Sequence, residues 1–116
     1  MTIKRFPGRH KGRCRAVVNG GLVYAVATDT SSAEGISEQT RLTLDTLEKT
    51  LLEAGSDKSR LLQATVYLRD MSMKADMDAV WCAWVGDEEN WPQRACVGAD
   101  LAGEDLVEIV VTAALA

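Results

Sequence analysis

Alternating apolar and polar positions predict a β-hairpin near the start of the chain and a further strand near its middle. Arg13 to Asn19 and Leu22 to Ala27 read as two strands, joined by the strong turn signal Asn19-Gly20-Gly21. Leu61 to Arg69 alternates again, which is typical of a strand with one apolar face. The residues expected on that apolar face are Leu62, Ala64, Val66 and Leu68.

Apolar residues spaced three and four apart predict two helices. The first helix runs from about Ser37 to Ala54 and ends at Gly55, a residue that readily takes the left-handed conformation of a helix end. Its expected buried stripe is Thr40, Leu44, Leu47, Leu51 and Ala54. Ser72 is the expected cap of the second helix, and Gly86 its end. Its expected stripe is Met77, Val80, Trp81, Trp84 and Val85.

Two closing strands place charges where apolar residues dominate. Pro92 marks the entry to the first of them, in which Arg94, Cys96 and Gly98 point to one side. The second, Leu106 to Val111, is apolar on both faces except at Glu108. A carboxylate buried in such a strand costs several kcal/mol unless it is compensated. Arg94 and Glu108 are therefore the first residues to examine for chemistry.

The predicted order of elements is β-β-α-β-α-β-β within a single domain spanning residues 1–116. Residues 1–11 are expected to form an irregular N-terminal arm, with a turn at Pro7-Gly8, and Thr28 to Gly35 a loop. Two helices on one face of a mixed sheet define a two-layer α+β sandwich. The opposite sheet face has no helix to cover it, so we expect it to pack against other subunits.

Composition and charge narrow the class of protein. The 116 residues carry a formal net charge of −4, although no acid precedes Asp29. The basic residues at the start are Lys4, Arg5, Arg9, Lys11, Arg13 and Arg15. Because only Phe6 accompanies them to stack on bases, a solvated tail on an acidic body or a neighbouring subunit is favoured over a nucleic-acid arm. We therefore expect no nucleic-acid partner.

Membrane insertion, disulfides and zinc are also disfavoured. No apolar run approaches the roughly 20 residues that span a bilayer, and no apolar core follows the N-terminal charges as in a signal peptide. The three cysteines are odd in number and lack CxxC spacing. These features predict a reduced, cytoplasmic protein.

The residues available for catalysis are few. The single histidine, His10, lies in the expected arm, which argues against Ser-His-Asp and Cys-His arrangements. No phosphate-binding glycine pattern or cluster of metal ligands is evident, so we expect no cofactor and no metal.

Arg94 and Glu108 each have a functional and a structural interpretation. The guanidinium of Arg94 is suited to two-point recognition of a carboxylate, which is favoured over an ion pair with an internal acid such as Glu108. Glu108 is equally consistent with a general base that positions water and with the ion-pair partner. Cys96 reads as a small buried residue rather than a nucleophile.

At these residues the chain resembles the RidA/YjgF family of enamine and imine deaminases, from about Arg13 to Ala114. The most specific parts are Trp91-Pro92-Gln93-Arg94-Ala95-Cys96-Val97, similar to the family's Pro-x-Arg-x-x-Val signature, and Val107-Glu108-Ile109. Thr65-Val66-Tyr67-Leu68-Arg69-Asp70 also fits the family pattern.

The resemblance implies a chorismate-mutase-like protomer that assembles as a homotrimer, with substrate clefts between subunits. It also implies hydrolysis of 2-imino or enamine acids to 2-keto acids and ammonia without a cofactor. Arg94 matches the arginine that holds the substrate carboxylate, Glu108 the acid that positions or activates water, and Cys96 a cysteine that lines the site.

Two departures indicate a divergent subgroup. The family commonly has Ser-Gly-Gln where this chain has Val26-Ala27-Thr28, and an early tyrosine where it has Arg13-Cys14-Arg15. Thr28 is counted with Arg94 and Cys96 as a candidate substrate-binding residue. The alternative function is binding of 2-keto acids or other small carboxylates by a regulatory trimer, without turnover. RNA cleavage is the third candidate function and is ranked last.

Overall fold

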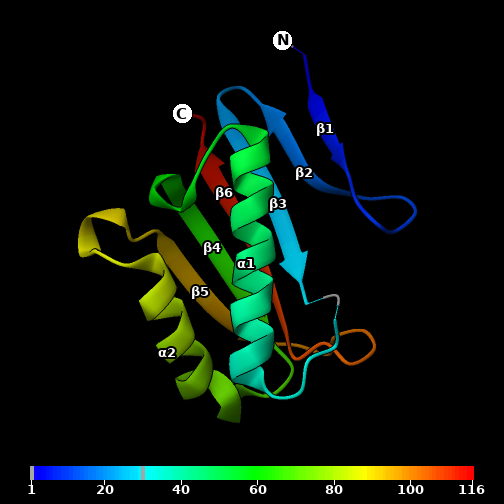
Figure 1. Cartoon of the computed structure of the whole chain (residues 1–116), viewed down its shortest axis with the longest axis vertical. Coiled ribbons are helices and arrows are strands. Elements are labelled where there is room, and N and C mark those ends of the chain that lie inside the picture. Colours follow the sequence, from blue (N-terminus) through cyan, green and yellow to red (C-terminus); the bar gives the residue numbers. More distant parts are fainter. Residues whose placement is uncertain (1, 30) are drawn as a thin grey trace.

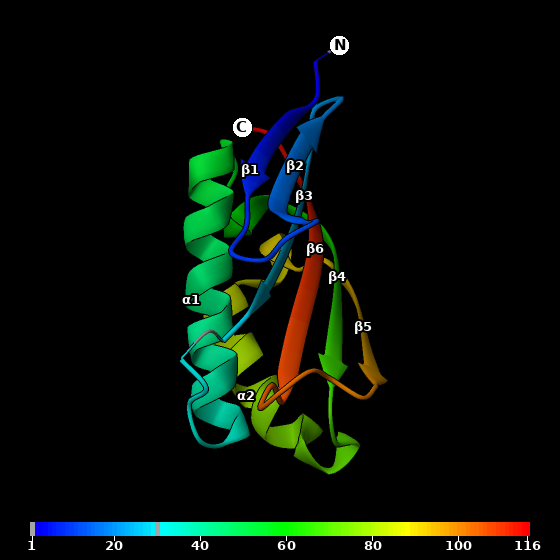
Figure 2. The ribbon, with the colours of Figure 1, turned by 90° about the vertical axis from the view of Figure 1, so that its right-hand side faces the viewer.

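The computed structural model describes residues 2–29 and 31–116 and has a six-stranded sheet with two helices packed on one face (Figures 1 and 2). The helices are α1 (Ile36–Ala54) and α2 (Lys74–Val85). The strands are β1 (Lys4–Pro7), β2 (Cys14–Asn19), β3 (Leu22–Thr28), β4 (Leu61–Leu68), β5 (Gln93–Gly98) and β6 (Val107–Ala114), and the short 3-10 turns are η1 (Lys58–Arg60), η2 (Met71–Met73) and η3 (Glu88–Asn90). The predicted two-layer α+β sandwich is confirmed.

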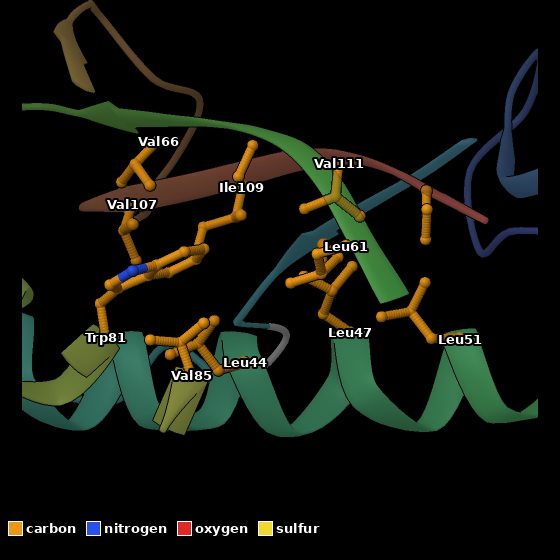
Figure 3. Packing of buried hydrophobic residues seen from close by; sticks show 14 of the residues in the cluster. Leu44, Leu47, Leu51, Leu61, Val66, Trp81, Val85, Val107, Ile109 and Val111 are labelled. Atoms are coloured by element: carbon orange, nitrogen blue, oxygen red, sulfur yellow. The ribbon is translucent and has the colours of Figure 1, made fainter. Parts of the chain in front are cut away.

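The core lies between the helices and the covered face of the sheet (Figure 3). The predicted stripe of α1 is buried throughout, and Gly55 ends this helix in the left-handed conformation. On α2, Met77, Trp81 and Val85 are buried, whereas Val80 and Trp84 are only partly covered. Those two residues line the outer groove between the helices, because α2 packs beside α1 as well as on the sheet.

The strands occur in the order β1-β2-β3-β6-β4-β5, so β5 is an edge strand. β4 and β5 are parallel, whereas every other pair is antiparallel. Parallel neighbours need a crossover connection, and here α2 supplies it. The crossover places α2 over the side chains of β5 that point toward the helices.

The prediction that residues 1–11 are irregular is wrong for residues 4–7. These form β1, which pairs antiparallel with β2, with Lys4 opposite Val18 and Phe6 opposite Ala16. Without β1, the backbone N–H and C=O groups along the outer side of β2 would be an unpaired edge. The sequence did not predict this strand because Phe6 is its one large apolar residue. In the structure, the Phe6 ring interacts with the cations of Lys4 and Arg15.

Two local predictions also differ from the structure. Ser72 does not cap α2, since η2 intervenes and Asp70 accepts the backbone N–H of Ser72. Leu62 does not face the core and is 49% exposed, while Leu61 is buried. The pairing of β4 with β6 shifts register between Leu61 and Gln63, and such an irregularity moves the following side chains to the other face.

Within the described residues, neither helix is long and apolar enough to cross a membrane.

Candidate functional site

Arg94 lies on the helix-covered face of the sheet. In the parallel pairing of β4 and β5, Arg94 is opposite Ala64 and Cys96 is opposite Val66, both of which are buried under the helices. Neighbouring residues in register point to the same side of a sheet. The predicted common face of Arg94 and Cys96 is therefore present, and it is turned toward α2.

The space beside Arg94 is filled by side chains from α2. Its guanidinium Nη2 donates to Asp78 Oδ1 at 2.6 Å, and Nη1 contacts the sulfur of Met77 at 3.9 Å. The guanidinium carbon lies 5.4 Å from the centre of the Trp81 ring, within the range of a cation–π interaction. The Arg94 side chain is consequently only 19% exposed.

Asp78 joins two cations. Its Oδ2 accepts from Lys74 Nζ at 2.7 Å, one turn earlier on α2, while Oδ1 accepts from Arg94. Burial raises the pKa of the Asp78 carboxyl, but the hydrogen bonds and charges of Lys74 and Arg94 outweigh burial and leave the pKa below its ordinary value. Asp78 is therefore an anion at neutral pH, and the cluster carries one net positive charge.

Cys96 follows Arg94 on the same face and packs against the core. Burial raises the pKa of its thiol, and the nearby charges of Arg94 and Lys74 only partly oppose that effect. The thiol form therefore predominates at neutral pH, and thiols are weaker nucleophiles than thiolates. This environment favours a lining role for Cys96 over a nucleophilic one.

Glu108 lies on the opposite, uncovered face of the sheet. It is directly opposite Thr28 on β3 and Tyr67 on β4, while its neighbours in sequence, Val107 and Ile109, are fully buried under the helices. Side chains directly opposite each other in antiparallel strands lie about 4.5–5.5 Å apart at Cβ. Thr28, Glu108 and Tyr67 therefore form a row across three neighbouring strands on the uncovered face.

Arg94 and Glu108 thus project from opposite faces of one sheet, with β4 between their strands. The internal acid that pairs with Arg94 is Asp78, not Glu108. One protomer by itself does not bring Arg94 and Glu108 together around a small substrate.

The loops on either side of this row are tied to each other by Gln39. Its amide nitrogen donates to the carbonyl oxygens of Ala33 and Glu104, and its amide oxygen accepts the backbone N–H of Leu106. Gln39 is buried on α1, so the helix holds both the loop that follows Thr28 and the loop that precedes Glu108.

Arg69 and Asp29 also form hydrogen bonds with groups of these loops. The Arg69 guanidinium donates to the carbonyl oxygens of Leu101, Gly103 and Asp105, and it therefore shapes the connection between β5 and β6. The Asp29 carboxylate accepts from the backbone N–H groups of Ser31 and Ala33 and from the Ser31 hydroxyl.

Asp78 and Tyr67 were not among the residues singled out from the sequence. The position of Asp78, next to Met77 and three residues before Trp81, was a usable signal, because both of those residues belong to the inward stripe of the helix. Tyr67 was recognisable only through its pairing with Glu108, which depends on strand register.

No group of three or more His, Cys, Asp or Glu side chains in residues 2–29 and 31–116 is placed to hold a metal ion.

Comparison with known proteins identifies the family. The family model described as Endoribonuclease L-PSP matches residues 13–115. A RutC family protein of Haemophilus ducreyi is 39% identical over 101 residues, which cover 86% of each chain. The RutC family protein YoaB of Escherichia coli is 34% identical over 116 residues, covering 99% of this chain and 100% of its own.

A solved structure agrees with these sequence matches. A member of the YjgF protein family from Neisseria meningitidis superposes with a TM-score of 0.93 at 39% identity, covering 100% of this chain and 97% of its own. The resemblance inferred from the Arg94 and Glu108 segments is thereby confirmed across the whole domain. The chain belongs to the YjgF/RidA family, the group that the Endoribonuclease L-PSP model describes.

Proposed function

We propose that this protein hydrolyses reactive 2-imino or enamine acids to 2-keto acids and ammonia. The observation that carries the proposal is the Arg94 guanidinium, which is held at the sheet edge beside Cys96 in a chain of this family. Such a group can pair with the carboxylate of an amino-acid-derived substrate through two parallel N–H bonds. Asp78 and Met77 occupy only part of its donor set, since a guanidinium carries five N–H groups.

The site is assigned to the junction of two protomers in a homotrimer. Arg94 and Cys96 come from one protomer, and Glu108 with Thr28 comes from its neighbour. Two features support this division: Arg94 and Glu108 face opposite ways within one sheet, and β5 is an edge strand that a neighbour can approach.

The uncovered sheet face supplies the surface for assembly. Tyr24, Val97 and Val110 lie on it with large exposed areas, although they are apolar or aromatic. Apolar faces of this kind are typical of contacts between subunits. We therefore assign this face to the trimer interface.

The chemistry needs only water and proton transfers. The imine nitrogen is protonated when the substrate binds. Glu108 accepts a proton from water as the water oxygen attacks the iminium carbon, which gives a neutral tetrahedral carbinolamine. Glu108 returns this proton to the nitrogen, the C–N bond breaks, and ammonia leaves as the hydroxyl proton passes to Glu108 and the carbonyl forms. Arg94 holds the carboxylate and orients the imine carbon, and a neutral Cys96 thiol lines the pocket.

Complementation between two inactive variants tests the site directly. Arg94→Ala and Glu108→Gln should each lose turnover of a freshly generated 2-imino acid. If the site spans two protomers, co-refolding equal amounts restores sites whose Arg94 and Glu108 are both intact. Random assembly of cyclic trimers then recovers roughly one quarter of parental activity.

Three results contradict the proposal. Full activity in Arg94→Ala excludes its carboxylate role, and failure of the mixed protein to recover activity excludes the shared site. A parent protein that binds pyruvate but never accelerates imine hydrolysis is instead a small-carboxylate binder.

Cleavage of RNA is the competing activity suggested by the name of the family model. The net charge of −4 opposes it, because binding to a phosphate backbone relies on positive charge. Cleavage of RNA by the parent at physiological salt, with no hydrolysis of imines, would reverse this ranking.

A further inference from the structure

The contact between Asp78 and Arg94 joins a helix to an edge strand. Asp78 lies on α2 and Arg94 on β5, and their oxygen and nitrogen atoms are 2.6 Å apart. The two residues are 16 positions apart in sequence, so the contact arises from the crossover of α2 over β5. A bond between a charged donor and a charged acceptor is among the stronger hydrogen bonds in proteins.

The remaining contacts restrict how the Arg94 guanidinium can turn. Trp81 interacts with it through its ring, and the Met77 sulfur lies near Nη1. Both residues are buried on the inward stripe of α2. One helix therefore supplies an aromatic surface, a sulfur contact and a carboxylate to a single side chain.

Asp78 is itself held in place. Lys74 binds its second oxygen at 2.7 Å, one turn earlier on the same helix. The carboxylate thus has one oxygen committed to Lys74 and the other to Arg94. Because Asp78 uses one oxygen on one nitrogen of the guanidinium, the contact orients Arg94 without occupying its full donor set.

We propose that Asp78 is a positioning residue, which holds the Arg94 guanidinium in the orientation that receives the substrate carboxylate. This inference rests on the proposed function for the identity of the ligand. Asp78 acts through Arg94 and touches no reacting atom. The opposite role, a carboxylate that competes with the ligand for Arg94, predicts the reverse change in affinity.

The main test is Asp78→Asn, which keeps the shape of the side chain and removes its charge. Pyruvate serves as a stable 2-keto acid probe, measured by calorimetry, alongside the KM for a 2-imino acid. The pyruvate Kd and the KM should rise about tenfold, as expected if one charge-assisted bond no longer orders the guanidinium, while kcat changes little. An unchanged or lower Kd overturns the proposal, and a lower one identifies Asp78 as a competitor.

Asp76→Asn is the matched control. Asp76 lies on the same helix, is exposed, and lines the outer groove away from Arg94. The Asp76→Asn substitution removes the same charge from the first turns of α2 and should leave the Kd and KM at parental values. Equal weakening by both variants would assign the effect to net charge or helix stability and would overturn the positioning role.

A double-mutant cycle separates positioning from general damage to the fold. In an Arg94→Ala background, Asp78→Asn should weaken pyruvate binding no further, because the group it positions is gone. Additive losses of affinity would contradict the proposal. Asp78→Glu, which keeps the charge on a longer stem, should recover part of the parental affinity.

A readout without any ligand distinguishes failure of this inference from failure of the proposed function. Phenylglyoxal modifies accessible arginines, and peptide mass spectrometry reports the rate at Arg94. Asp78→Asn should accelerate modification of Arg94 several-fold and leave the rate at Arg41 unchanged. If that holds while the parent neither binds pyruvate nor hydrolyses imines, the proposed function fails and the Asp78–Arg94 coupling stands. An unchanged rate at Arg94 would overturn the coupling itself.

Discussion

The surroundings of Arg94 and Glu108 depend on the face of the sheet on which each residue lies. Arg94 points under α2 and is enclosed by Asp78, Met77 and Trp81. Glu108 points to the uncovered face, between Thr28 and Tyr67. The same two charges that stand out in the sequence therefore have different surroundings: Arg94 has an internal counter-ion, whereas Glu108 lies in a row with Thr28 and Tyr67.

Glu108→Gln tests the proposed general base. Glutamine keeps the shape and can still hydrogen-bond water, but it does not accept a proton. Turnover of a 2-imino acid should fall roughly 10²–10⁴-fold while the Kd for pyruvate barely changes. Glu104→Gln, in the exposed loop before β6, should be neutral in both assays. Loss of pyruvate binding together with loss of thermal stability would instead show that Glu108 is structural.

Thr43 offers a test of the core. It is fully buried on α1, and its hydroxyl has no hydrogen-bond partner among the described residues. Thr43→Val replaces that hydroxyl with a methyl group of similar size, so the free energy of unfolding in urea should rise by about 1 kcal/mol. Thr46→Val, on the exposed side of the same helix, is the control and should change little. Equal stability of Thr43→Val and the parent would show that the hydroxyl is satisfied in solution.

The loops around the candidate site are held by side chains of neighbouring elements. Gln39 on α1 binds backbone groups of Ala33, Glu104 and Leu106, and Arg69 binds three further carbonyl groups between β5 and β6. Local opening of a loop is less favourable when its backbone groups are hydrogen-bonded to a stable helix. The helix α1 therefore holds in place the two loops that flank Thr28 and Glu108.

Gln39→Leu should loosen both loops at once. It removes three hydrogen bonds and leaves partly buried backbone groups unpaired, which should lower the free energy of unfolding by about 2–4 kcal/mol. Hydrogen exchange should accelerate at the amide of Leu106, which loses its acceptor. Gln63→Leu, on an exposed position of β4, is the control. Unchanged protection at Leu106 would contradict the bridging role.

The whole molecule is an unevenly covered sandwich. Both helices lie on one face of the sheet (Figure 2), and the other face exposes Tyr24, Val97 and Val110. β1 protects the edge at β2, whereas β5 forms the opposite edge. Assembly through the uncovered face would bury these apolar groups and complete a site that one protomer holds only in part.

Val110→Asp tests this assembly. Val110 is 38% exposed at the centre of the uncovered face, and burying an unpaired carboxylate between subunits is strongly unfavourable. Sedimentation should show a trimer for the parent and a monomer for the variant, with turnover lost. Leu52→Asp, at a 59% exposed position on the outer side of α1, should remain trimeric and active. A parent that sediments as a stable monomer at micromolar concentration would exclude the shared site.

The sequence by itself determined the elements whose signals are local. Helix periodicity and the glycines at 55 and 86 set both helices and their ends, and alternation placed Arg94 and Cys96 on one strand face. The motif around Arg94 and the segment around Glu108 also sufficed to identify the family. These features depend on residues a few positions apart, where backbone geometry fixes which side chains share a side.

The tertiary structure decided what depends on pairing between distant segments. Strand register placed Tyr67 and Thr28 beside Glu108, and the irregularity after Leu61 turned Leu62 outward. Pairing with β2 made a strand of Lys4–Pro7, which alone has too little apolar surface to read as one. The crossover of α2 gave Arg94 its partner Asp78 and turned it away from Glu108. Periodicity shows that two side chains share a side of one element, but only packing of that element against its neighbours decides which side it is.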